Sequence, residues 1–95
     1  MYKSLNPLLH APLRLSIMSL LMGLDEAEFT FLKEKTEATA GNLSLQLHQL
    51  EEAGYIKIKK GFKANYPVTT IQITSKGTKA FVAYVAVLKN IIRTA

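Results

Sequence analysis

The sequence contains no cysteine, which excludes disulfide bridges, thiolate metal sites and thiol redox chemistry. A chain of 95 residues without a covalent cross-link buries limited surface on folding, so some stabilisation by association between copies is expected. The absence of cysteine is also typical of proteins in a reducing compartment. We therefore expect a cytoplasmic protein.

Long apolar runs are also missing, and no stretch reaches the roughly 20 residues that a membrane-spanning helix needs. The apolar N-terminal segment, MYKSLNPLLHAPLRLSIMSLL, lacks a basic leader and a small-residue cleavage site. Two prolines and Arg14 also interrupt it. We expect this segment to be part of the fold rather than a signal peptide, and we expect no membrane partner.

Side chains that catalyse reactions near neutral pH are scarce. The only two histidines are His10, among leucines at a helix start, and His48. No cysteine or nearby cluster of acids completes a catalytic or metal site around either one. We expect a protein that is not an enzyme and that uses no cofactor and no metal.

Acidic residues are absent from the C-terminal part of the chain, after Glu52. All seven lie between Asp25 and Glu52, and the segment from Ala53 to the end carries eight basic residues and no acid. The first part has a net charge of −3 and the second +8. This asymmetry favours a polyanionic partner, although a domain that is basic without a function for its charge remains an alternative.

Apolar spacing predicts one domain over residues 1–95, with three helices first. Leucine and isoleucine recur along one face of a helix from Pro12 to near Gly23. A short extended piece before Phe29 precedes a second helix, for which Thr30 is the expected cap. A third helix runs from the Thr39 cap to about residue 53, where a glycine ends it. The tight connection between the last two predicts a helix-turn-helix at about 30–53.

Alternating residues then predict a β-hairpin. YIKIKK places isoleucines inward and lysines outward, VTTIQIT returns, and the loop GFKANYP between them forms a basic tip. Thr74 is the expected cap of a final helix at about 75–94. The order α-α-α-β-β-α is mainly α with a small β-hairpin, and it predicts a winged helix-turn-helix whose wing is the hairpin at about 55–74.

The third predicted helix has two faces. Leu43, Leu47 and Leu50 fall within one narrow arc, which we expect to be buried. The other arc offers amides that can pair with adenine and an imidazole that can donate to guanine or phosphate, which favours reading of DNA in the major groove. The alternative is an ordinary solvated face. The candidate DNA-binding residues are Thr39, Gly41, Asn42, Ser44, Leu45, Gln46, His48 and Gln49.

The lysines of the hairpin are candidates for contacts with DNA phosphates. Such contacts release counterions and add affinity without sequence information. Alternating lysines also prevent edge strands from aggregating, so this alternative stays open. The candidate wing residues are Lys59, Lys60, Lys63 and Asn65.

The last helix, KAFVAYVAVLKNII, is apolar on too many sides to contact only its own domain. We expect a homodimer through this helix, because two-fold dimers are the commonest oligomers. A larger partner, or complete burial within the chain, is the alternative. The candidate dimer residues are Phe81, Tyr84, Val85, Leu88, Ile91 and Ile92.

Four segments also resemble a known family. NPLLHAPLRLSIMSLL, FTFLKE, GNLSLQLHQLEEAGYI and ITSKGTKAF are similar to the small winged-helix regulators of the MarR/ArsR-like group in archaea and bacteria. The resemblance covers roughly residues 5–92. It implies a DNA-binding transcriptional regulator, usually a homodimer, with the third helix in the major groove.

By family habit the resemblance favours a repressor that binds an inverted repeat in a promoter. Leu45, Gln46 and His48 depart from the family pattern, so the target sequence cannot be inferred from relatives. Whether a small-molecule effector exists is open. A winged helix used only for protein–protein contact is the alternative function, since a fold does not fix a function.

Overall fold

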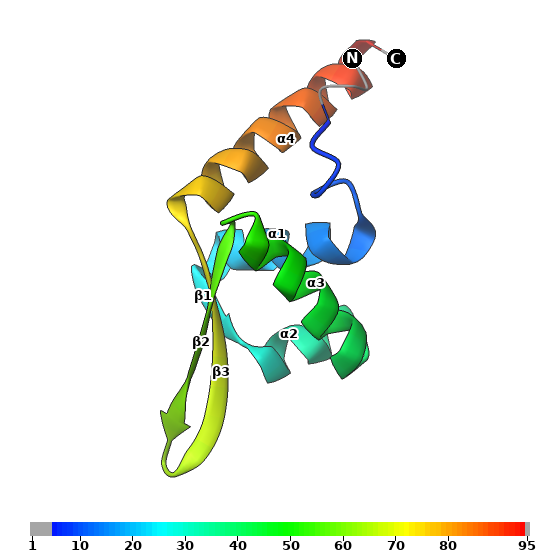
Figure 1. The fold of residues 1–95 in the computed structure, drawn as a ribbon. Coiled ribbons are helices and arrows are strands. Elements are labelled where there is room, and N and C mark those ends of the chain that lie inside the picture. Colours follow the sequence, from blue (N-terminus) through cyan, green and yellow to red (C-terminus); the bar gives the residue numbers. More distant parts are fainter. Residues whose placement is uncertain (1–4, 95) are drawn as a thin grey trace.

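A computed structural model describes residues 5–94 of the chain. Its helices are α1 (Pro12–Leu24), α2 (Phe29–Thr36), α3 (Ala40–Glu52) and α4 (Ser75–Thr94), and its strands are β1 (Glu26–Glu28), β2 (Ile56–Lys63) and β3 (Tyr66–Ile73). The helices α1 to α3 pack together, the β2–β3 hairpin projects from them, and α4 extends in the opposite direction (Figure 1). The predicted winged helix-turn-helix is confirmed. Residues 1–4 and 95 of the predicted domain lie outside the described residues.

The core lies where α1 to α3 meet the base of the sheet. The predicted stripe on α1 is buried through Ile17 and Leu21, while Leu13 and Leu20 pack at its edge. Within residues 5–94 no polar or charged side chain is buried. The fully buried side chains are Leu9, Ile17, Met18, Leu21, Leu32, Leu43, Leu47, Leu50, Ile56 and Ile71, joined by the nearly buried Tyr84. Hydrophobic burial therefore holds this part of the fold together.

The helix-turn-helix has one cap that was predicted and one that was not. The hydroxyl of Thr39 accepts a hydrogen bond from the backbone N–H of Asn42 at 3.2 Å, as expected for an N-cap. The predicted cap at Thr30 is wrong, because α2 begins at Phe29 and Glu28 is its N-cap residue. The cause is β1, whose pairing with β3 brings the chain directly into the helix.

The strands of the hairpin are longer than predicted, because most of GFKANYP is strand rather than loop. The connection consists only of Ala64 and Asn65, whose φ angles are 50° and 69°. Positive φ at both central residues matches the two-residue turn whose twist suits a hairpin. The ladder therefore continues to the pair Lys63 and Tyr66 at the outer end. The extended piece expected before Phe29 is confirmed as β1, an edge strand beside β3.

A tight corner fixes the start of α4. Thr74 caps the helix as predicted, accepting from the N–H of Gly77 at 3.0 Å, and its hydroxyl donates to the Gly54 carbonyl at 2.6 Å. A Cβ atom at Gly77 would lie 2.2 Å from the carbonyl oxygen of Tyr55, so only glycine permits this approach. Gly54 ends α3 with φ of 81°, as its position predicted. The starts of α4 and β2 are thus joined at one point.

Candidate nucleic-acid interface

The helix α3 presents one face to the core and another to solvent. Leu43, Leu47 and Leu50 are buried, which confirms the predicted seam. The opposite face is open, and its largest apolar side chain, Leu45, is 55% exposed. The other exposed candidates on or beside this helix are Thr39, Gly41, Asn42, Ser44 and His48. A polar face with one apolar side chain can contact both base edges and a thymine methyl group.

Gln46 and Gln49 lie differently from the other candidates. Both are half-buried, and both side-chain carbonyls accept hydrogen bonds from the guanidinium of Arg14 on α1, with an Nη1–Oε1 distance of 3.0 Å to Gln49. Arg14 Nε also donates to the carbonyl of Leu8. Gln49, predicted on the exposed arc, is therefore turned toward α1 in this structure.

The amide of Gln46 continues this network onto the open face. Its Nε2 donates to Oδ1 of Asn42, one turn earlier on α3, at 3.1 Å. This hydrogen bond positions the side chain of Asn42, and the amide nitrogen of Asn42 can still donate to another group. A chain of hydrogen bonds thus runs from Arg14 through Gln46 to Asn42. No local sequence pattern predicts this chain, because it depends on how α1 crosses α3.

The two acids at the end of α3 have separate partners. Glu52 Oε1 lies 3.1 Å from Nε2 of His48, and both side chains are well exposed. Glu51 instead accepts from the backbone N–H of Ile58 at 3.3 Å, so it joins the end of α3 to β2. One carboxylate therefore lies beside a candidate DNA-binding histidine, and the other supports the wing.

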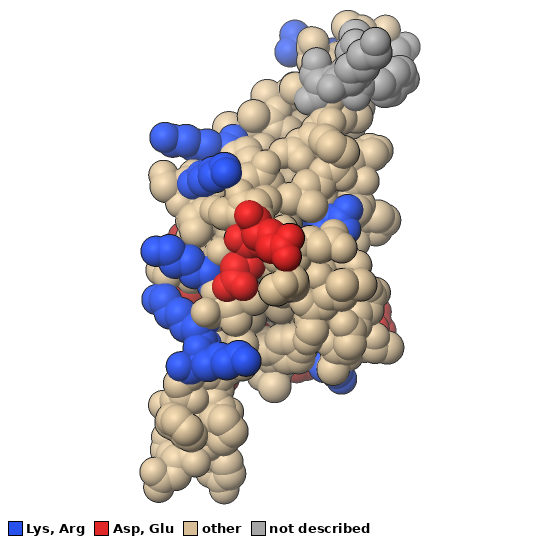
Figure 2. All heavy atoms as spheres, viewed as in Figure 1, with Lys and Arg blue, Asp and Glu red and all other residues tan. Residues whose placement is uncertain are grey.

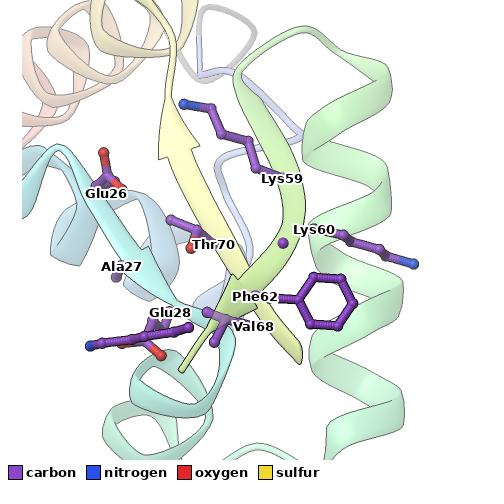
Figure 3. A pocket seen from close by; sticks show the side chains of 10 residues that line it. Glu26, Ala27, Glu28, Lys59, Lys60, Phe62, Val68 and Thr70 are labelled. Carbon is purple, nitrogen blue, oxygen red and sulfur yellow. The ribbon is translucent and has the colours of Figure 1, made fainter. Parts of the chain in front are cut away.

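The strand register divides the hairpin into two faces. Lys57, Lys59 and Lys63 lie on the outer face, whereas Lys60 lies on the face that carries Ile58 and the core. Figure 3 shows Lys59 and Lys60 projecting from opposite sides of β2. The candidate Asn65 is exposed in the turn. Basic side chains gather along the edge of the molecule above the hairpin end, which shows none in this view (Figure 2).

The end of the hairpin is aromatic. Phe62 is 80% exposed and Tyr66 is 74% exposed. Lys63 does not extend freely beyond them, because its Nζ lies 3.9 Å from Oε2 of Glu28 on β1. Phe62 is not among the residues that the sequence motifs predict to bind DNA. Its signal was the alternation Ile56, Ile58, Lys60, Phe62, which continues onto a part of the strand with no core beneath it.

A groove of about 330 Å³ separates α3 from the wing. Ser44 and His48 line it from α3, and Lys60 and Thr69 line it from the hairpin. This groove brings together candidates that are far apart in the sequence. A second hollow, of about 520 Å³, lies on the other side against β1, where Glu26 and Glu28 face lysines (Figure 3). The first groove is the better place for a polyanion, since no acidic side chain lines it.

The predicted dimer residues on α4 differ in burial: one is buried, one is exposed and the others are half-buried. Tyr84 is only 3% exposed, and its hydroxyl lies 2.9 Å from Nδ1 of His10. It therefore belongs to the core of its own chain, which corrects its assignment to a dimer surface. Ile92 is open, at 66% exposure, as is Val82 on the same helix. The remaining predicted residues, which are half-buried, are Phe81, Val85, Leu88 and Ile91.

Residues 5–94 contain neither a metal-binding cluster nor a membrane-spanning helix. No cluster of three or more histidine or acidic side chains there is arranged to hold a metal ion. No helix in the same part of the chain has the length and apolarity to cross a membrane.

The fold and this surface define a winged helix domain of the DNA-binding class. Residues 13–92 match the family described as winged helix DNA-binding domain, and the chain belongs to that family. It is 44% identical to the uncharacterized protein MJ0432 of Methanocaldococcus jannaschii over 72 residues, covering 76% of this chain and 78% of the relative. The resemblance noted in the sequence is thus confirmed at the level of the winged helix DNA-binding family.

Solved structures agree. A transcriptional regulator homologue from Pyrococcus horikoshii OT3 superposes with a TM-score of 0.87 at 31% identity, covering 92% of this chain and 86% of the other. A MepR-like protein shares the fold, with a TM-score of 0.73 at 17% identity, over 90% of this chain and 63% of the other. An ArsR family regulator, RHA00566, shares it with a TM-score of 0.59 at 19% identity, over 93% and 86%.

Proposed function

We propose that this protein is a sequence-specific transcriptional regulator that binds a promoter inverted repeat as a homodimer and acts as a repressor. The observation that carries the proposal is the groove where Ser44 and His48 of α3 face Lys60 of the wing. A helix with an open polar face beside a basic hairpin matches the two needs of DNA recognition, base contact and phosphate contact. Family membership supports the DNA partner and a role other than catalysis.

In this proposal α3 enters the major groove. Asn42 pairs with a base edge, Leu45 contacts a thymine methyl, and His48 donates to a guanine or phosphate. Gln46 and Gln49 either stay hydrogen-bonded to Arg14 and support the DNA-contacting residues, or leave Arg14 when the protein binds DNA. The remaining candidates Thr39, Gly41 and Ser44 approach the DNA backbone near the helix start.

The wing supplies phosphate contacts through Lys59, Lys60, Lys63 and Asn65. The lysines lie on both faces of the hairpin, so they reach phosphates on either side of it. With about four phosphate contacts per subunit, a dimer should show a slope of log affinity against log salt of about −7.

The homodimer is supported by α4. Its exposed Val82 and Ile92 leave apolar surface that a second copy would cover. A two-fold pair would then place its reading helices about 34 Å apart, one turn of DNA. A monomer in sedimentation at micromolar concentration would contradict this part of the proposal.

The test of DNA reading is a fluorescence anisotropy titration with duplexes selected by the protein from a random pool, at two salt concentrations. Asn42→Ala should reduce the preference for selected over unselected duplexes by about tenfold, because a bidentate base contact is lost. Binding to unselected duplexes should not change. If the wild type shows no salt-dependent binding to any duplex, the function is instead that of a protein-interaction module.

A further inference from the structure

The end of the wing has a composition that phosphate contact does not explain. On the face of the hairpin that turns toward α3, the cross-strand pairs change character along the ladder. Ile56 with Ile73 and Ile58 with Ile71 form the first two pairs, over the core. Lys60 and Thr69 follow at the groove, and Phe62 with Pro67 comes last. An apolar pair thus stands beyond a lysine, where no core covers it.

Both side chains of this pair are exposed. Phe62 is 80% exposed, the highest value among the exposed large apolar side chains of residues 5–94. Pro67 opposite it is also exposed. An exposed benzyl group contributes little to folding, and large exposed apolar side chains commonly mark contact surfaces. Figure 3 shows Phe62 and Lys60 projecting from the same side of β2.

We propose that Phe62, supported by Pro67, is an apolar wedge that enters the minor groove of duplex DNA and opens a base step there. This inference rests on the proposed DNA-binding function and adds a mode of recognition to it. Two residues of a strand span roughly 7 Å, so Phe62 lies about that far beyond Lys60. The minor groove is about 6 Å wide, so a lysine on the phosphate at its edge leaves the next outward side chain over the groove.

Charge selects DNA over a protein as the occupant. Lys60 lies next to the wedge on the same face, and Lys59 and Lys63 flank it on the other. Lysine is depleted from the centres of protein interfaces because its ammonium is costly to desolvate, whereas phosphates on both sides of a groove favour it. The groove beside Lys60 is continuous with Ser44 and His48 of α3. The wedge therefore lies at the end of the surface already assigned to DNA.

A side chain that opens a step makes affinity depend on how easily that step deforms. Pyrimidine–purine steps such as TA and CA unstack readily, whereas A-tracts are stiff. Apolar wedges between base steps also bend the duplex toward the major groove. The protein should therefore prefer a flexible step beneath the wing even though Phe62 makes no hydrogen bond to a base.

The experiment uses the full chain and duplexes of about 30 base pairs that the wild type selects from a random pool. Donor and acceptor dyes at the duplex ends report bending, and 2-aminopurine placed at successive positions reports unstacking. With the wild type, we expect end-to-end energy transfer to rise and 2-aminopurine to brighten at one step per half-site. Phe62→Ala should remove both signals and weaken binding by about tenfold, with the salt slope unchanged.

Three variants separate the wedge from other effects. Phe62→Leu should keep both signals, since leucine also serves as a wedge. Tyr66→Ala removes an aromatic side chain of similar exposure from the opposite face of the hairpin end and should keep the 2-aminopurine signal. Leu24→Ala, an exposed apolar side chain at the end of α1, should change nothing measured. Thermal melting should be the same for all four variants.

The outcomes distinguish this inference from the function on which it rests. If the wild type binds duplexes with a steep salt slope but Phe62→Ala matches it in affinity, bending and fluorescence, the wedge is disproved and DNA binding stands. The end of the wing would then be a contact for another protein. If Tyr66→Ala abolishes the signals as fully as Phe62→Ala, the face-specific wedge is also disproved. If the wild type binds no duplex, both proposals fail together.

Discussion

The helix α3 and the β2–β3 hairpin carry the candidate contacts in opposite ways. Several side chains of α3 have partners that restrict them. Arg14 donates a hydrogen bond to Gln46, Gln46 donates one to Asn42, and Glu52 lies beside His48. The outer half of the hairpin is exposed, and Lys63 is tied only to Glu28 by a long ion pair. This difference suggests a division in which a braced helix discriminates between sequences and an exposed basic wing supplies affinity.

The largest effect should come from the wing. Lys60→Ala combined with Lys63→Ala removes four of the phosphate contacts proposed for a dimer, so the salt slope should flatten by about 3.6. Affinity at low salt should fall on the order of 100-fold for every duplex alike. Anisotropy titrations with selected and unselected duplexes measure both quantities. Lys89→Ala, an exposed lysine on α4, is the matched control and should leave the slope as it is. A loss confined to selected duplexes would break the division between helix and wing.

An intermediate effect should follow from the brace behind α3. Arg14→Met keeps much of the aliphatic stem but removes the donors to Gln46 and Gln49, so these two amides lose their link to α1 and only the bond from Gln46 to Asn42 remains. Preference for selected duplexes should fall about fivefold, while the salt slope stays the same. Arg14→Lys should also lose preference, because one ammonium cannot reproduce a planar fork of donors. If the salt slope of Arg14→Lys is instead steeper than that of Arg14→Met by the amount expected for one phosphate contact, Arg14 binds DNA directly.

The smallest effect should come from Glu52, the carboxylate beside His48. Glu52→Gln removes a negative charge near the proposed phosphates and frees the imidazole, so affinity at low salt should rise about twofold to threefold. The gain should disappear at high salt, where exposed charges are screened. Glu34→Gln changes an exposed carboxylate on α2 and serves as the control. A decrease in affinity would mean that Glu52 orients His48 for its contact rather than opposing DNA.

Local signals in the sequence predicted much of this fold. The leucine spacing of α3, the Thr39 cap and Gly54 at its end each depend on neighbours within one helix, and the structure confirms all three. The same is true of Thr74 at the start of α4. Such features follow from the helical repeat and from the needs of terminal backbone groups, so they do not require knowledge of the tertiary structure.

The features that sequence reasoning missed depend on contacts between distant segments. Thr30 was expected to cap α2 because nothing local revealed that β1 would pair with β3. Tyr84 was assigned to a dimer surface because its contact with His10 joins positions 74 residues apart. The roles of Arg14 and Phe62 were hidden for the same reason, since one depends on a helix crossing and the other on the register of a hairpin.

The contact of Gly77 with the Tyr55 carbonyl also affects the angle at which α4 leaves the rest of the domain. Because no side chain intervenes, α4 starts at the corner where α3 ends and extends 20 residues from it. That length is about 30 Å, so a tilt of about 10° at the corner displaces the far end by about 5 Å. In a dimer joined through α4, this angle would affect the distance between the two α3 helices, and therefore the spacing of the half-sites that the dimer can bind. Substituting Gly77 would push α4 away from the Tyr55 carbonyl and so change this angle.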